Sequence, residues 1–385
     1  MNSSLTEQSP ALSSPMPMNP VVEVFHKAVQ LPQDCLTLMA AQPGDSLAFG
    51  AAWMDNLERT VFSEHQGIRY FTLRDEQGAL AVLPTMLAKD SLGKHVSGLS
   101  NYYTAIFQPA LRAGLSTLDL LPLVRELRRH HAGLASITLA PMDPGSEAYQ
   151  TIEAALAQNG FGVFRYFCFG NWYLNAPESW TGYLASREGK LRSTIKRMSQ
   201  RIAADKGRVE ILTKPEDMQR GIDAYQHVYD RSWKIPEPSP DFMPGLIRLC
   251  AQQGAMRLGI VWLNDQPIAA QFWMVYQGRA EIYKLAYDEA FKSHSPGTVL
   301  TSQLMQHVLE HDNVREIDYL IGDDPYKQSW MSHRRERWGL VAYNRRSVWG
   351  LWGNTNEWVR RAIKPVWLKL KGAIQVAMSR INTPH

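Results

Sequence analysis

The chain has few cysteines and no long apolar stretch. Three cysteines occur among its 385 residues, Cys35, Cys168 and Cys250, and they lie far apart without the spacing of a metal site. This argues against a disulfide framework and indicates a reducing compartment. Because no run of 18 apolar residues is present, we expect no segment that spans a membrane. The expected location is therefore cytoplasmic.

Two further absences limit the classes of protein to consider. Residues 1–20 are rich in Ser, Pro and Met but lack a basic start and an apolar core, so we expect a disordered tail rather than a signal peptide. His307 and His311 lie four residues apart, but no third metal ligand has a sensible position. We therefore expect no metal, and surface positions for both histidines.

The most informative pattern lies in residues 280–330. Residues 280–287 alternate in the manner of a strand, 298–311 carry apolar residues at helical spacing, and 314–321 form a second strand pattern. A strand, a helix and a strand of these lengths predict a right-handed crossover with roughly parallel strands. A Gly-Asp-Asp turn at 322–324 then leads into a further helix.

The turn before the expected helix suggests a site for an anion. Lys292, Ser293 and Ser295 precede Pro296 and Gly297, after which the helix begins. A helix N-terminus presents unpaired backbone N–H groups and a partial positive charge, so it attracts anions. On the turn alone, an ordinary helix start capped by Ser295 remains the alternative.

The same region carries a family resemblance. The residues concerned are Tyr283, Ala286, Tyr287, Ser295, Pro296, Gly297, Leu300, Asp318, Tyr319, Leu320, Gly322, Tyr326, Lys327 and Trp330. Their spacing over about residues 180–343 resembles a GNAT-type acyltransferase group named for a cellulose-biosynthesis acetyltransferase (the CelD/BcsL group), which is related to Fem-type transferases. The resemblance implies tandem GNAT-like halves with one competent site, in which residues 293–298 hold the pyrophosphate of acyl-CoA.

Both halves of the chain show a similar order of elements, with hairpin turns of matching position at 75–78 (DEQG) and 264–267 (NDQP). We expect an α/β (α+β) fold of tandem GNAT-like domains, each a mixed, mostly antiparallel sheet flanked by helices. The expected division is a tail (1–20), a non-catalytic domain (21–175), a catalytic domain (176–348) and a basic amphipathic helix (354–381). Further expected strands are 21–26, 69–73, 79–87, 102–108, 135–140, 161–174, 256–263 and 268–276; further expected helices are 49–62, 118–129, 146–158, 184–202 and 224–233.

Acyl transfer from a thioester to an amine requires loss of a proton from the amine, stabilisation of an oxyanion, and a proton for the thiolate. The candidate catalytic residues are Glu281, Asp318 and Asp323 as bases, Tyr326 as proton donor, and Lys327 beside them. A capped helix at 322–330 is the alternative. For acetyl-CoA or another acyl-CoA, the candidate binding residues are Tyr287, Lys292, Ser293, Ser295, Gly297 and Thr298.

The acceptor is expected to be a small amine, derived from a sugar or an amino acid. Candidate substrate-binding residues are Arg187, Arg192, Tyr229, Trp233, Tyr283 and Trp330. The two arginines belong to a strongly basic helix whose cations equally fit a solvated face. Tyr229 and Trp233 belong to an aromatic stripe, for which core packing is the alternative.

The C-terminal end is basic, since residues 334–380 hold eleven Lys or Arg and two acids. The amphipathic pattern of 354–381 predicts binding to an anionic membrane surface, or else packing on the body or in a dimer. We expect an acyl-CoA-dependent N-acyltransferase, and the family resemblance implies a role in cell-envelope or exopolysaccharide biosynthesis. The alternatives are a Fem-type transferase that uses aminoacyl-tRNA, the one nucleic acid considered, and a non-catalytic adaptor at the membrane.

Overall fold

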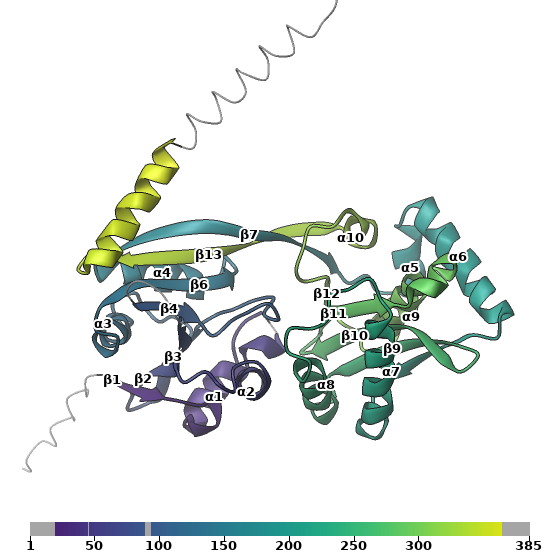
Figure 1. Cartoon of the computed structure of the whole chain (residues 1–385), viewed down its shortest axis with the longest axis horizontal. Helices are drawn as coiled ribbons and strands as arrows, with labels where there is room; N and C mark the ends of the chain where they lie inside the picture. The colour runs from purple at the N-terminus through teal and green to yellow at the C-terminus, as the bar shows by residue number, and fades with distance from the viewer. Residues whose placement is uncertain (1–19, 45, 89–93, 364–385) are drawn as a thin grey trace, which may run out of the picture.

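The structure is a computed structural model that describes residues 20–44, 46–88 and 94–363 (Figure 1). Within these ranges the strands form one continuous 13-stranded sheet in the order β1-β2-β3-β4-β6-β13-β7-β12-β11-β10-β9-β8, with β5 paired to β3. Helices flank this mixed sheet, which confirms the predicted α/β class. The expected tail lies outside the described residues apart from residue 20.

We call residues 20–175 together with 333–363 the N-terminal lobe. Its strands are β1 (Val21–Phe25), β2 (Ile68–Asp75), β3 (Gly78–Leu87), β4 (Lys94–Gly98), β5 (Ala110–Leu111), β6 (Leu134–Met142), β7 (Phe161–Asn175) and β13 (His333–Asn344). Its helices are α1 (Gln33–Ala40), α2 (Ala51–Thr60), α3 (Leu121–His130), α4 (Glu147–Gln158), the 3-10 turns η1 (Ala28–Gln30) and η2 (Leu47–Phe49), and a helix over 348–363.

We call residues 176–332 the C-terminal lobe. Its strands are β8 (Arg208–Leu212), β9 (Met256–Leu263), β10 (Gln266–Tyr276), β11 (Arg279–Tyr287) and β12 (Glu316–Asp318). Its helices are α5 (Trp180–Ala185), α6 (Gly189–Ala204), α7 (Met218–Asp230), α8 (Phe242–Gln252), α9 (Pro296–Glu310) and α10 (Pro325–Trp330), with the 3-10 turns η3 (Pro215–Asp217) and η4 (Glu289–His294).

Local chemistry accounts for several element boundaries. Ser146 caps α4, since its side chain accepts a hydrogen bond from the backbone N–H of Tyr149 at 3.2 Å. The β9–β10 hairpin turns at Asn264 and Asp265, which both adopt positive φ, 49° and 60°. Asn and Asp tolerate this backbone conformation, and a two-residue hairpin turn of matching twist requires it.

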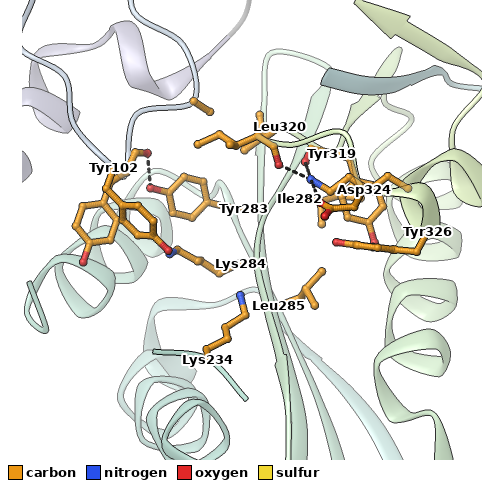
Figure 2. A pocket seen from close by; sticks show the side chains of 14 residues that line it. Tyr102, Lys234, Ile282, Tyr283, Lys284, Leu285, Tyr319, Leu320, Asp324 and Tyr326 are labelled. Atoms are coloured by element: carbon orange, nitrogen blue, oxygen red, sulfur yellow. Dashed lines mark hydrogen bonds and ion pairs between the residues drawn. The ribbon is translucent and has the colours of Figure 1, made fainter. Parts of the chain in front are cut away.

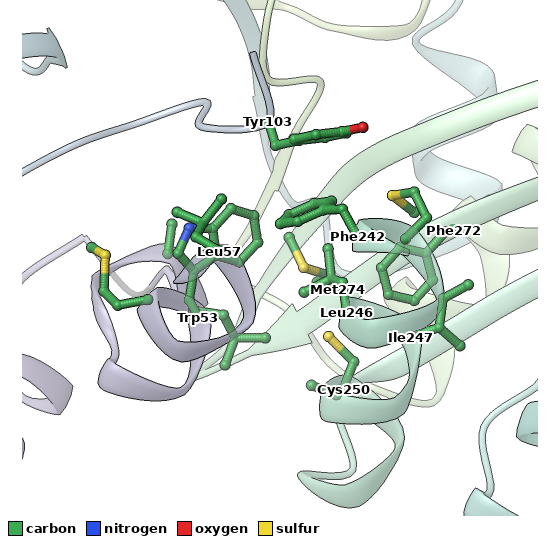
Figure 3. Close-up of a cluster of buried hydrophobic side chains, with 14 of the residues drawn as sticks. Trp53, Leu57, Tyr103, Phe242, Leu246, Ile247, Cys250, Phe272 and Met274 are labelled. Atoms are coloured by element: carbon green, nitrogen blue, oxygen red, sulfur yellow. The ribbon is translucent and has the colours of Figure 1, made fainter. Parts of the chain in front are cut away.

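The two lobes are joined by long strands and by a shared core. In Figure 1, β7 and β13 run together along the top of the molecule, and their antiparallel register extends from Phe161↔Asn344 to Tyr173↔His333. One hydrophobic cluster includes residues of α2 in the N-terminal lobe and α8 in the C-terminal lobe. Figure 3 shows the side chains of Trp53 and Leu57 facing Phe242 and Leu246 across this boundary.

Most of the strands and helices expected from the sequence are present within a few residues, including the parallel β11–β12 pair. Three expectations were wrong. Residues 102–108 form an irregular loop rather than a strand; the strand expected over 314–321 is limited to Glu316–Asp318; and α7 ends at Asp230, so Trp233 lies beyond the helix. The expected C-terminal helix begins earlier, at 348, and the part beyond 363 lies outside the described residues.

Candidate active site between two separating strands

The two parallel strands of the crossover separate after a short paired region. β11 pairs with β12 only from Arg279↔Glu316 to Glu281↔Asp318. The chain after β12 then follows β7, because the backbone N–H of Tyr319 donates to the Trp172 carbonyl at 2.9 Å. From Ile282 onward, β11 therefore has no strand partner on this side among the described residues, and the backbone of this strand is open to a ligand.

A β-bulge lies at the point of separation. On β10, Phe272 and Trp273 pair with Lys284 and Ile282, so Tyr283 is the additional residue in β11. A bulge bends a strand and redirects its side chains, and bulges are frequent beside active sites. The hydroxyl of Tyr283 donates to the Tyr103 carbonyl at 2.7 Å, which ties the strand to the loop of the N-terminal lobe.

A cavity of about 250 Å³ occupies the space between the separated strands (Figure 2). Both lobes contribute to its wall. The lining residues are Tyr102, Tyr103, Ala105, Lys234, Ile282, Tyr283, Lys284, Leu285, Tyr319, Leu320, Ile321, Asp324, Tyr326 and Lys327. Aromatic rings, three amines and one carboxylate thus surround an open strand edge, a combination suited to a small polar substrate.

Lys327 is buried against the segment that follows β12. Its amine donates to the carbonyls of Tyr319, at 3.3 Å, and Ile321, and lies 3.6 Å from a carboxylate oxygen of Asp324. Burial lowers the pKa of Lys327, and the Asp324 carboxylate opposes this shift. The amine therefore fixes the backbone of residues 319–321 along one wall of the cavity.

Lys284 and Lys234 lie at the opposite wall. The Lys284 amine forms an ion pair with Glu237 at 2.9 Å and lies over the Tyr102 ring at 4.6 Å. The backbone N–H of Lys234 donates to the Ser232 hydroxyl at 3.3 Å, but its amine forms no hydrogen bond or ion pair within the described parts of the chain. This amine lies 5.9 Å from the ring centroids of both Tyr229 and Trp233. Burial, followed by the charges of Lys284 and Lys327, lowers the pKa of Lys234 to about 8.

The first turn of α9 has free space beside it, although the backbone N–H groups of Thr298 and Val299 donate to the Ser295 carbonyl, at 3.0 and 3.3 Å. Ser295 occupies the N-cap position with φ 43°, but its side chain makes no capping hydrogen bond. A Cβ added at Gly297 would meet only the Tyr287 ring, at 3.5 Å, within 4 Å. The preceding loop is held against α6, since Arg201 donates to the Ser293 carbonyl at 3.1 Å and His294 lies 2.9 Å from Asp205. The first turn therefore has room for an anionic group.

The structure brings together some of the candidate catalytic residues. Tyr326 and Lys327 line the cavity, and burial, followed by the Asp324 charge, raises the pKa of Tyr326 well above its usual value. Glu281 and Asp318 are buried outside the cavity lining, where both lie beside Arg279. Asp323 also lies outside it and accepts hydrogen bonds from Arg334 and the Trp172 indole.

The candidate donor-binding residues lie at the far end of β11 rather than in the cavity lining. Tyr287 packs against Trp233, with ring centroids 4.6 Å apart, and lies beside Gly297. Lys292 and Ser293 are exposed in η4, and Ser295 and Thr298 flank Gly297 at the start of α9. The strand thus leads from the cavity to the helix N-terminus.

The candidate substrate-binding residues are spread more widely. Tyr283 lines the cavity. Arg187 donates to the Trp330 carbonyl at 3.1 Å and to the Ser332 hydroxyl at 2.7 Å, so it clamps the end of α10. Trp330 and Tyr229 are buried, which fits the packing alternative, whereas Arg192 is exposed on α6.

Sequence reasoning missed the contribution of the N-terminal lobe and two amines. Tyr102 and Tyr103 were assigned to a strand, although the Asn101 side chain, which accepts from the Tyr103 N–H at 3.0 Å, is a turn signal. Lys284 faces the cavity from a strand whose alternation was recognised, and Lys234 follows Trp233 in a proline-rich link. No pattern along the chain brings these amines together.

Comparison with known proteins supports the assignment of the fold. Residues 189–328 match the family model described as acetyltransferase (GNAT) domain. No curated protein matches the chain. Among solved structures, FemX is similar with 12% identity, 84% of this chain and 97% of that chain covered, and a TM-score of 0.57.

Two further solved structures are similar at the level of fold. One is a conserved protein of unknown function from Bacteroides thetaiotaomicron VPI-5482, with 11% identity, coverage of 80% and 96%, and a TM-score of 0.53. The other is the C-terminal domain of a protein from Agrobacterium fabrum described as a lysylphosphatidylglycerol synthetase, with 14% identity, coverage of 80% and 90%, and a TM-score of 0.50. At these identities the likeness concerns the fold alone.

The matched domain supports an acyltransferase. The narrower CelD/BcsL resemblance stays a prediction. In the described part of the chain, no cluster of three or more His, Cys, Asp or Glu side chains is arranged to hold a metal ion. None of the helices described there has the length and apolar character needed to cross a bilayer.

Proposed function

We propose that the protein is an acyl-CoA-dependent N-acyltransferase that acts in cell-envelope or exopolysaccharide biosynthesis. The observation that carries the chemistry is the separation of β11 from β12 at Glu281↔Asp318, with a cavity at the open edge of β11. A thioester carbonyl laid along this edge would have backbone N–H groups available for its oxyanion. The pathway rests on the family resemblance.

The reaction requires few protein groups. The acceptor ammonium first loses a proton, for which Asp324 is the one carboxylate among the described residues lining the cavity. The neutral amine then attacks the thioester carbonyl, the C–N bond forms and the C–S bond breaks. The thiolate takes a proton from Tyr326, and the acylated nitrogen releases its remaining extra proton, which restores the phenol through solvent. Burial, followed by the Asp324 charge, raises the pKa of Tyr326, so its phenol is protonated when the reaction begins.

Binding of acyl-CoA can be tested at the start of α9. We expect acetyl-CoA or a longer acyl-CoA to stabilise the wild-type protein in a thermal-shift titration. Gly297→Glu should weaken that binding at least about tenfold, because a carboxylate beside the helix N-terminus repels a diphosphate. Gln303→Glu adds the same charge within the same helix and is the matched control. Equal affinity of both variants would place the donor site elsewhere.

An aminoacyl-tRNA donor is the second candidate, favoured by the position of α6 beside the α9 loop. The exposed cations of this helix are Lys190, Arg192, Lys196 and Arg197. If they bind RNA phosphates, affinity for charged tRNA should fall steeply as salt rises. Stabilisation by acyl-CoA without tRNA binding excludes this donor, and silence toward both favours a non-catalytic adaptor.

We also propose that the C-terminal helix attaches the protein to the inner face of an anionic membrane. Helix 348–363 projects from the body in Figure 1, and its outward face is apolar: Val348 is 81% exposed, Trp352 66% and Trp358 67%. Basic residues precede and follow this face, namely Arg345, Arg346, Lys364, Lys369, Lys371 and Arg380. Tryptophan with flanking cations suits the boundary of an anionic bilayer.

Vesicle co-sedimentation tests this attachment. We expect binding to vesicles that contain phosphatidylglycerol and little binding to pure phosphatidylcholine vesicles. Deletion of residues 354–385, or Trp352→Glu in the full chain, should release the protein. Unchanged co-sedimentation of both variants would discard the proposal.

A further inference from the structure

Among the described residues, the cavity between the lobes contains one amine, that of Lys234, without a direct ion-pair partner. The amines of Lys327 and Lys284 are both engaged, the first by two carbonyls and Asp324, the second by Glu237. The Lys234 amine contacts the rings of Tyr229 and Trp233 and feels the Glu237 charge, but no carboxylate of the described residues forms an ion pair with it. Figure 2 shows its amine turned toward the cavity beside the Lys284 side chain.

An unpaired ammonium in a partly enclosed site is unfavourable unless a ligand neutralises it. Burial disfavours the charged form, and the neighbouring Lys284 adds repulsion, so both effects lower the pKa of Lys234. Lys284 lies close enough for its charge to act on Lys234, while its own partner Glu237 neutralises one of the two charges. The pair therefore presents an excess of positive charge to the cavity.

We infer that Lys234, supported by Lys284, binds a carboxylate or phosphate group of the acceptor, so that the substrate is an anionic primary amine. This inference rests on the proposed acyltransferase function. The cavity volume of about 250 Å³ suits an acceptor group the size of an amino acid or a monosaccharide. The exposed Tyr102 supplies an aromatic ring for its apolar surface, and the open edge of β11 lies across the cavity.

An alternative role for Lys234 is general base, since an amine of lowered pKa can accept a proton. Arginine distinguishes the two roles. Lys234→Arg keeps a cation that binds carboxylate or phosphate but cannot act as a base near neutral pH. Lys234→Met removes both properties while it keeps the length and the apolar stem of the side chain.

The first experiment measures anion binding without any reaction. Inorganic phosphate and acetate are titrated separately against the full chain, with fluorescence of the tryptophans, among them Trp233 beside Lys234, as the readout. We expect saturable binding of at least one anion by wild type and Lys234→Arg, and at least about tenfold weaker binding by Lys234→Met. Lys214→Met, at a side chain 70% exposed, is the control. Binding that is equal in all variants, or absent from wild type, overturns the inference.

The second experiment measures acceptor preference with acetyl-CoA as donor. Glucosamine 6-phosphate is compared with glucosamine, and alanine with alaninamide; the phosphate pair and the carboxylate pair separate the two sources of the anion. We expect kcat/KM to favour the charged member of one pair at least about tenfold in wild type and Lys234→Arg, and this ratio to approach one in Lys234→Met. A ratio that Lys234→Met leaves unchanged overturns the inference.

The two proposals fail in different ways. If acetyl-CoA does not bind but phosphate or acetate still binds through Lys234, the donor is wrong and the anion subsite stands. If acetyl-CoA is used equally well with neutral and anionic amines, the acyltransferase stands and the anion subsite is wrong.

Discussion

At the scale of single residues, Asp318 is fully buried and still carries a charge. Burial alone would raise its pKa, but Arg279, Arg335 and Arg337 outweigh burial and hold the pKa of Asp318 well below the usual range. The Asn171 amide and the backbone N–H of Leu320 also donate to this carboxylate, at 2.5 and 2.6 Å. Its partners come from β7, β11 and β13, so the carboxylate joins both lobes.

Asp318→Asn should therefore destabilise the protein by about 3–5 kcal/mol, because it leaves buried arginines without their counterion. A carboxylate whose folded pKa is depressed contributes stability above its unfolded pKa and loses it as pH falls toward the folded value. We expect the difference in unfolding free energy between wild type and variant to be constant above about pH 5 and to shrink in more acidic solution. A chemical denaturation series over pH measures it; a difference that is independent of pH contradicts the assignment.

Lys234 predicts the opposite pH dependence. Its pKa of about 8, set by burial and by Lys284 and Lys327 against Glu237, lies below that of an unfolded lysine. The unfolded chain thus binds more protons between pH 8 and 10.5, and the contribution of this group to stability rises with pH. Lys234→Met should be more stable than wild type at pH 7, by up to about 3 kcal/mol, and should lose this advantage by pH 10.

Urea unfolding at the two pH values, with Lys214→Met as the exposed control, measures the effect. If wild type and Lys234→Met differ by the same unfolding free energy at pH 7 and at pH 10, the pKa of Lys234 is not lowered. Ligand-free protein is required, because a bound anion raises the pKa of the amine and removes the difference.

At the scale of elements, α2 and α8 approach one another through a glycine. A Cβ at Gly245 would lie 2.1 Å from the side-chain oxygen of Asn56, whose amide donates to the Phe242 carbonyl at 3.3 Å. Asn56 is 1% exposed, so it has little room to move. The absence of a side chain at position 245 therefore sets the distance between helices from the two lobes.

Gly245→Ala should cost about 1–3 kcal/mol, because the added methyl group overpacks the boundary. Gly189→Ala in the exposed first turn of α6 is the matched control, and helix propensity predicts no loss there, since only Arg192 comes within 4 Å, at 3.9 Å. Thermal unfolding of Gly245→Ala and Gly189→Ala measures the two changes in stability. A Gly245→Ala protein as stable as wild type would show that the helices can move apart freely.

Sequence patterns predict some of the strands and loops of this protein but not others. The β2–β3 and β9–β10 hairpins were predictable, because each strand is a short run rich in apolar residues and each turn carries Gly, Asn or Asp, which tolerate positive φ. The loop at 102–108 was not, since aromatic residues that pack across a lobe boundary have the composition of a strand. β13 was also missed, because its first half is a run of charged residues whose arginines pair with Glu316 on β12 and with Asp143 just after β6.

The same reasoning applies to the candidate site. The crossover, the start of α9, and the positions of Tyr283, Tyr326 and Lys327 follow from local periodicity and turn chemistry. The burial of Glu281 and Asp318 beside Arg279 could not be predicted, because the sequence does not show whether arginines or solvent surround a carboxylate on a strand. Tyr102 and Lys234 reach the cavity only through the packing of the two lobes.

At the scale of the whole molecule, the sheet does not divide where the chain does. β13 follows the C-terminal lobe in sequence but lies between β6 and β7 of the N-terminal lobe. Leu340 and Ala342 of this strand belong to the same buried cluster as Leu127 and Phe161. The first lobe is therefore complete only after the second has been synthesised, and the cavity requires both.

This topology predicts how fragments behave. Residues 20–175 alone lack β13, so β6 and β7 lose a shared partner strand and the core residues that it supplies; we expect aggregation or a broad, non-cooperative unfolding transition. The register Tyr173↔His333 places the end of β7 beside the start of β13. A fusion that joins residue 175 to 333–363 through a short hairpin turn should restore the strand, with higher protease resistance and a sharper transition than the shorter fragment. If residues 20–175 unfold as cooperatively as the fusion, β13 is dispensable and the lobes are independent domains after all.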